Sequence, residues 1–296
     1  MPPAFGAAST NGAGYEAGDR GRRRRLVLRV VVPVVVIAFV AGVVGVAIFG
    51  GSNSTVSSGT SKVSPSASRL LRSSLASARK VDSFHYVSSS TLGGAQGGTQ
   101  KTVGDAGPDQ GKQVISAGNQ RFTVLVVGRA CYLKGNAAAL VANLGLTSTT
   151  ATAYAGQWIS LAQSDGPYAS VYAAVTAGSA LADNITVVPT GQLPPTKVAG
   201  RRVETVTGSI APIRIGGQLE APKGTATLAV RVTTPHLPVR YTERGTLNRE
   251  PTTTTVTFDH WGETVDVTAP AHAVSYASLG AGSGTTPTTP GGPVLT

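Results

Sequence analysis

The chain has 296 residues, 25 Lys and Arg against 14 Asp and Glu, and a formal net charge of +11. Six of the basic and two of the acidic residues precede Val30, so the rest still carries 19 against 12, or +7. Anionic lipid headgroups or cell-wall polymers would suit this charge outside a cell, although a solvated surface with excess Arg explains it equally well. No basic stripe interleaved with aromatic side chains is present, so we expect no nucleic-acid partner.

The first element is an uncharged apolar run at residues 30–49, preceded by Arg20, Arg29 and a run of four arginines between them. At about 1.5 Å per residue, twenty helical residues span the hydrocarbon core of a bilayer. Positive charge stays cytoplasmic. We therefore predict a disordered basic cytoplasmic tail (1–25), a single transmembrane anchor (26–49) and an extracytoplasmic main domain attached to the cell membrane.

A cleaved signal peptide is the alternative interpretation of this run. Its apolar region is usually only about 7–15 residues long, and no Ala-x-Ala follows here; Gly45-Val46-Ala47 is the nearest match. A lipoprotein signal is excluded more firmly, because it needs a cysteine after the run and the only cysteine is Cys131. We interpret Cys131, which lies in a strand-like run, as a buried inert thiol.

A Ser/Gly linker (50–65) leads to a folded domain (66–279), and a disordered Gly/Thr/Pro tail (280–296) follows it. Apolar positions 70, 71, 75 and 78 share one helical face and predict a helix over 66–80. Strands are predicted next at 84–90, 99–103, 113–117, 121–127 and 130–133, as in an antiparallel meander.

Helices are predicted over 136–144 and over 168–181, the second opened by Pro167. Strands resume at 185–188, 203–207, 225–232, 239–244, 253–259 and 264–268, with a strand at 157–161 between the helices. The last two alternate apolar and polar residues, and we expect them to form a closing hairpin around Asp259-His260-Trp261-Gly262. About ten antiparallel strands with two helical insertions indicate an α+β fold: one large curved sheet with helices against one face.

We predict no catalytic residues, no metal site and no cofactor. The four histidines have no metal-ligand spacing, and neither a Gly-x-Ser-x-Gly elbow nor a phosphate-binding Lys loop is present. Ser77 and Lys80 match Ser-x-x-Lys, but companion motifs are missing, and such a short match arises by chance. We therefore expect a protein that is not an enzyme.

Several segments resemble the LppX/LprG-type envelope lipoproteins, part of the wider LolA-like group of lipid carriers. The segments are residues 78–85, the turn within residues 127–134, Gly156-Gln157-Trp158-Ile159, residues 198–208 and, as the most specific of them, residues 258–270. The resemblance implies a half-barrel antiparallel sheet with helices on its concave face and an apolar cavity between them. It departs from the family in one respect, because a membrane helix stands where the family carries a lipidated cysteine.

What the resemblance implies for function is binding of an acylated lipid or glycolipid and its transfer through the bacterial cell envelope, with the membrane and an envelope transporter as partners. The alternative is a LolA-like sensor or protein-docking module without lipid transport; a hydrolase is a third hypothesis that no constellation supports. Small side chains in the helices leave room for a cavity, although they also permit close packing. The candidate lining residues, each of which could equally be ordinary core, are Val124, Val126, Leu140, Leu144, Tyr168, Val171, Tyr172 and Val175.

Overall fold

The computed structural model describes residues 63–93, 97–215, 218–220, 223–247 and 249–280. The predicted cytoplasmic tail and anchor, nearly all of the linker, and the C-terminal tail lie outside these residues. Within the described part, no helix is both long and apolar enough to cross a bilayer.

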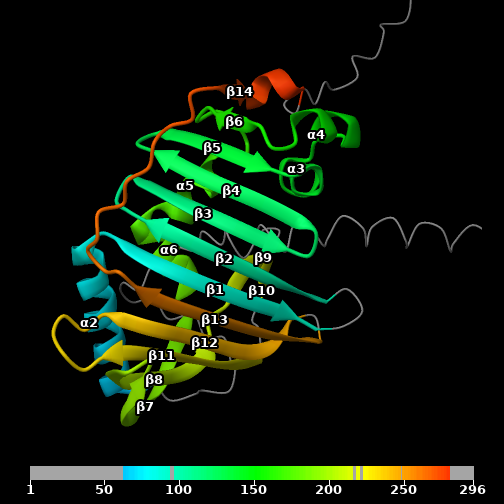
Figure 1. The fold of residues 1–296 in the computed structure, drawn as a ribbon. Coiled ribbons are helices and arrows are strands. Elements are labelled where there is room, and N and C mark those ends of the chain that lie inside the picture. The colour runs from blue at the N-terminus through cyan, green and yellow to red at the C-terminus, as the bar shows by residue number, and fades with distance from the viewer. Residues whose placement is uncertain (1–62, 94–96, 216–217, 221–222, 248, 281–296) are drawn as a thin grey trace, which may run out of the picture.

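One twelve-stranded sheet dominates the structure (Figure 1). Its strand order is β14-β6-β5-β4-β3-β2-β1-β13-β12-β11-β8-β7, and every neighbouring pair is antiparallel except β14 and β6. A second pair, β9 (Ile213–Ile215) and β10 (Gln218–Glu220), forms a separate ribbon. The strands of the main sheet are β1 (Phe84–Leu92), β2 (Gly98–Ala106), β3 (Gln110–Ala117), β4 (Gln120–Val127), β5 (Ala130–Gly135), β6 (Trp158–Leu161), β7 (Val187–Val198), β8 (Arg201–Ile210), β11 (Lys223–Arg231), β12 (Pro238–Leu247), β13 (Glu250–Asp259) and β14 (Ala273–Ser275).

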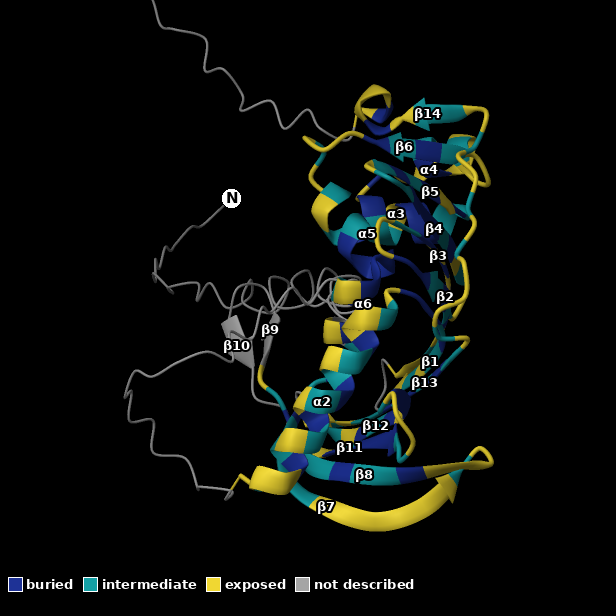
Figure 2. Cartoon of the chain, turned by 90° about the vertical axis from the view of Figure 1, so that its left-hand side faces the viewer, coloured by how far each residue is buried: buried dark blue, intermediate teal, exposed yellow. Residues whose placement is uncertain are grey.

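The sheet is curved and unclosed, and the helices lie on its inner side (Figure 2). The predicted α+β architecture, a single large curved antiparallel sheet with helices on the concave face, is confirmed at this level. The helices are α2 (Pro65–Val81), α3 (Ala137–Leu144), α4 (Ser148–Tyr154), α5 (Tyr168–Val175), α6 (Ala177–Asn184) and the 3-10 turn η1 (Tyr276–Leu279). The helix predicted over 168–181 is thus two helices, broken at Thr176, whose backbone is extended.

Two apolar clusters fill the space between the sheet and the helices. One joins α2 and α6 to the β1, β13, β12, β11 and β8 half of the sheet, with Tyr86, Tyr241 and Phe258 almost fully buried. The other joins α3, α5 and η1 to β3, β4, β5 and β6. The opposite, convex face carries only a small cluster of Val203, Ala229 and Val239 among the described residues.

The predicted closing hairpin is wrong. β13 pairs with β1 on one side and with β12 on the other, so both of its edges are occupied and no strand from residues 264–268 can be added beside it. Instead residues 260–272, which we call the strap, run along the side of the sheet from β13 to β14 (Figure 1). Two hydrogen bonds with Ser83 fix the start of the strap: Gly262 N donates to its carbonyl, and its hydroxyl donates to Glu263 O at 2.8 Å.

Candidate functional site

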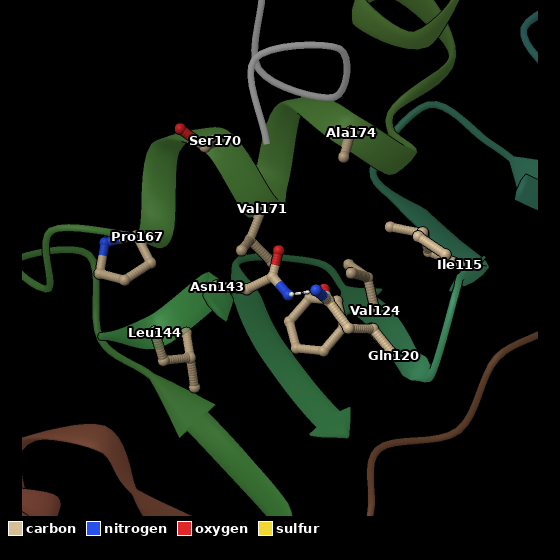
Figure 3. Close-up of a pocket in the computed structure, with 11 residues that line it drawn as sticks. Ile115, Gln120, Val124, Asn143, Leu144, Pro167, Ser170, Val171 and Ala174 are labelled. Carbon is tan, nitrogen blue, oxygen red and sulfur yellow. Dashed lines mark hydrogen bonds between the residues drawn. The ribbon is translucent and has the colours of Figure 1, made fainter. Parts of the chain in front are cut away.

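An apolar pocket lies between the β3–β4 hairpin and helices α3 and α5, with a volume of about 160 Å³. Figure 3 shows the side chains converging on it from these two strands and two helices. Its lining residues are Ile115, Ala117, Gln120, Phe122, Val124, Asn143, Leu144, Pro167, Ser170, Val171 and Ala174.

The floor of the pocket follows from the hairpin's tight turn. β3 and β4 are joined by only Gly118 and Asn119, and Gly118 has φ +54°, as a type II′ turn requires at its first central position. This turn fixes a register in which Ile115 lies opposite Phe122. Since side chains alternate between faces along a strand, Ile115 and Phe122 both point to the concave side, where they are buried.

The pocket's polar side consists of uncharged groups. The Asn143 amide donates to Gln120 Oε1 at 3.5 Å and to the Ala139 carbonyl at 2.8 Å. The neighbouring Arg121 turns its guanidinium to the carbonyls of Gly118 and Gln120 and does not line the pocket. A ligand would therefore meet aliphatic walls and an amide and hydroxyl margin.

Helix α5 forms one wall of the pocket, and its C-terminal end packs closely against the sheet. Directly after it, Ala177 N at the start of α6 donates to Gly107 O at 2.7 Å, and a Cβ built on Gly111 of β3 would lie 2.4 Å from the carbonyl oxygen of Val175 in α5. Only a glycine at this position of β3 lets the helix approach so closely. At the N-terminal end no side chain caps the helix, and Tyr168 Oη donates to the Arg129 carbonyl at 2.9 Å.

The eight predicted lining residues fall into three groups. Val124, Leu144 and Val171 line the pocket. Val126, Leu140 and Val175 have no exposed surface and lie in the surrounding core. Tyr168 and Tyr172 are partly buried against that core and stack on each other, with ring centroids 5.8 Å apart. Contact of any of them with a ligand stays a prediction.

Sequence reasoning missed most of the hairpin and the polar margin. Ile115, Ala117 and Phe122 share the concave face with Val124, and the two-residue turn at Gly118 was the signal that could have placed them together. Gln120, Asn143, Pro167 and Ser170 carried no such signal, because only the packing of α3 and α5 against the hairpin brings them to the rim.

Cys131 belongs to the same apolar cluster as this site and is fully buried on β5. Burial raises the pKa of its thiol to about 11, and a hydrogen bond with Tyr168 offsets part of that rise. The thiol is therefore protonated at neutral pH, as expected for an inert core residue.

A second cavity, of about 370 Å³, lies between the strap and the ends of β1, β2 and β3. Charged side chains dominate its walls: His85 Nδ1 lies 2.6 Å from Asp105 Oδ1, and Lys112, His260 and Glu263 stand around them. Such walls hold water and would not desolvate a hydrocarbon chain. Among the described residues, no three His, Cys, Asp or Glu side chains are grouped to hold a metal ion.

Comparison with known proteins gives no family model that matches the chain and no match among curated proteins. Solved structures similar to it include LppX, a lipoprotein of Mycobacterium tuberculosis, at 18% identity and a TM-score of 0.40, over 69% of this chain and 99% of LppX. LprF from Mycobacterium bovis aligns at 16% identity and a TM-score of 0.43, over 71% and 99% of the two chains. A LolA superfamily protein from Nitrosomonas europaea gives 10% identity and a TM-score of 0.30, over 65% and 91%. These are the groups that the sequence segments resemble.

Proposed function

We propose that this chain binds the hydrocarbon chain of an acylated lipid or glycolipid in the pocket between β3, β4, α3 and α5. The observation that carries the proposal is the apolar lining of this pocket on the concave face. In this proposal the chain is a membrane-tethered, extracytoplasmic protein of the cell envelope that aids lipid transfer, and it performs no catalysis.

The size of the pocket sets how much of a ligand it holds. A protein cavity of about 150 Å³ accommodates one benzene molecule, so about 160 Å³ suits about six carbons of one acyl chain. At about 0.8 kcal/mol per buried CH₂, this segment contributes about 5 kcal/mol of favourable transfer. A whole acyl chain requires α5 to separate further from the hairpin.

The attachment of α5 supports such a separation. Just beyond its C-terminal end, Ala177 N donates to the Gly107 carbonyl, whereas its N-terminal end, beside Pro167, is held by side-chain hydrogen bonds of Tyr168 with the Arg129 carbonyl and the Cys131 thiol. A swing about the Thr176 break would widen the pocket without breaking the strand pairing of the sheet.

The test is uptake of a fluorescent fatty acid, dansyl-undecanoic acid, by the full chain. In Ala174→Phe the new ring occupies the pocket, and we expect the dissociation constant to rise at least about tenfold, the equivalent of about 1.4 kcal/mol. The matched control is Val141→Phe on α3, whose side chain is 40% exposed and does not line the pocket. We expect that variant to bind as the unmodified chain does.

Two results would contradict the proposal. If the unmodified chain takes up no fatty acid and carries no lipid from its own membranes in native mass spectrometry, the docking or sensing alternative is favoured. If Ala174→Phe and Val141→Phe bind the probe equally well while both remain folded, the lipid site lies elsewhere.

A further inference from the structure

The convex face of the sheet carries an unusual row of side chains. In register across eight neighbouring strands stand Arg121, Ser116, Lys101, Ser89, Thr255, Thr242, Thr227 and Thr207. Each of them is cationic or carries a hydroxyl. With strands about 4.8 Å apart, the row is about 34 Å long.

A second row runs beside the first on the same face, and on each strand its residue is two positions away from the residue of the first row. It consists of Thr99, Thr91, Thr253, Arg244, Thr225 and Ser209. We call the two rows together the polar belt. Figure 1 views this face, and the described helices lie behind it, on the other side of the sheet.

The charge of the belt is not balanced by carboxylates. Lys101, Arg121 and Arg244 are exposed, and no ion pair of any Lys or Arg with a carboxylate is present in the described part of the chain. On the convex face of the described strands the carboxylates are Asp105 and Asp259, and a histidine nitrogen lies 2.6 Å and 3.1 Å from them. The strap adds the exposed carboxylates of Glu263 and Asp266 beside His85 and Lys112, at the end of the strands away from Lys101 and Arg121. The belt itself thus presents positive charge to an external partner.

The hydroxyls of the belt are also available. Thr227 Oγ1 donates to the Thr242 carbonyl at 3.5 Å, and among the described residues no other side-chain hydrogen bond involves the belt's hydroxyls. A ligand rich in hydroxyls could exchange hydrogen bonds with them along the whole row.

We propose that the polar belt binds a linear anionic polysaccharide lying across the strands. Cations at the β4–β2 end and on β12 match spaced carboxylates on such a polymer, and the intervening Ser and Thr match sugar hydroxyls. The face is convex, and the belt itself carries no aromatic or large aliphatic side chain. Val87, Val103 and Val114 lie in register beside the first row, but only Val114 of these three is exposed, so the face offers little apolar area for insertion into a bilayer interface. A flexible polymer can follow its curvature, whereas a flat membrane touches it only along a line.

The test measures binding of the full chain to alginate, a polyuronate, by affinity electrophoresis at low salt. The triple variant Lys101→Gln/Arg121→Gln/Arg244→Gln should lose about tenfold or more in affinity, and added salt should weaken the unmodified chain, because screened charges attract less. The matched control, Arg69→Gln/Arg72→Gln/Arg79→Gln, removes three exposed charges from α2 and should bind alginate as before.

A second variant separates sugar recognition from general charge attraction. Thr242→Val/Thr255→Val keeps every charge and the strand preference but removes two hydroxyls; we expect a severalfold loss for alginate. The proposal is overturned if the α2 variant loses as much as the belt variant, if neutral dextran binds equally well, if the Thr→Val variant binds unchanged, or if phosphatidylglycerol vesicles retain the chain and alginate does not. Fatty-acid uptake by the belt variant should be unchanged, which keeps this proposal separate from the pocket.

Discussion

At the scale of single residues, the two tryptophans have different surroundings, so the same substitution at each position can be compared. Trp261 packs on Phe84 with ring centroids 4.9 Å apart, and its indole N–H donates to the Pro238 carbonyl at 3.2 Å. Trp158 is half-buried at the start of β6, and its ring lies under the Lys134 ammonium. Trp261 therefore has a structural role in holding the start of the strap against β1 and β12.

We predict that Trp261→Ala lowers the free energy of unfolding by about 3 kcal/mol, whereas Trp158→Ala costs about 1 kcal/mol. Urea unfolding followed by circular dichroism measures both, with unchanged slopes confirming comparable unfolding. Equal losses would show that the aromatic cluster of Phe84, Phe258 and Trp261 does not hold the strap to the sheet.

The buried thiol of Cys131 gives a prediction about pH. Burial raises its pKa to about 11, so the folded state keeps its proton longer than the unfolded state does. The contribution of the neutral thiol to stability is therefore complete below the thiol's ordinary pKa and is lost as the pH rises towards about 11. We expect unfolding experiments above pH 9 to show a steeper loss of stability in the unmodified chain than in Cys131→Ala. If the stability of the two proteins falls equally with pH, deprotonation of the Cys131 thiol is not the cause of the loss.

At the scale of elements, glycine spacing governs how α5 meets the sheet. Gly111→Ala would place a methyl carbon 2.4 Å from the carbonyl of Val175, on backbone that cannot turn aside. We expect it to cost about 1–3 kcal/mol through overpacking. The control Gly178→Ala lies on α6 with no atom within 4 Å of the new carbon and should stabilise by about 0.5–1 kcal/mol. Thermal unfolding distinguishes the two; a stable Gly111→Ala would show that α5 is already free to move.

The elements also show which parts of the fold the sequence can predict. Alternation and turn residues located β3, β4 and β5 to within a few residues, since these strands have local turns and one buried face. The prediction of a closing hairpin failed because alternation of apolar and polar residues at 264–268 says nothing about whether β13 still has a free edge. That edge is taken by β1, a strand more than 150 residues away in the chain. The pocket was predicted in part for the same reason: its floor is local, and its rim is made by long-range packing.

At the scale of the whole molecule, the two faces of the sheet have different chemistry. The concave face holds the apolar clusters and the pocket, and the convex face holds the polar belt. In the proposed arrangement one protein holds a hydrocarbon chain on one side and contacts an envelope polymer on the other. The apolar run at residues 30–49 would keep both near the membrane.

Retention of that run is a prediction for the full chain. Intact-mass measurement of the protein from its own membranes should give the uncleaved chain, less at most the initiator Met, because the run exceeds a signal peptide's apolar region. A mass corresponding to cleavage near Ala47 would mean that the main domain is released and that the tether is not part of the mature protein.

The most direct test of the hydrocarbon site is photo-crosslinking with a fatty acid that carries a diazirine at the far end of its chain. The full chain is irradiated with the probe, digested, and the modified peptides are identified. We expect modification of the β3–β4 hairpin, around Ile115 and Val124, and of α5, around Val171 and Ala174, and competition by unlabelled fatty acid. Labelling confined to the convex face, or no labelling that competitor removes, would contradict the existence of a lipid site between the sheet and its helices.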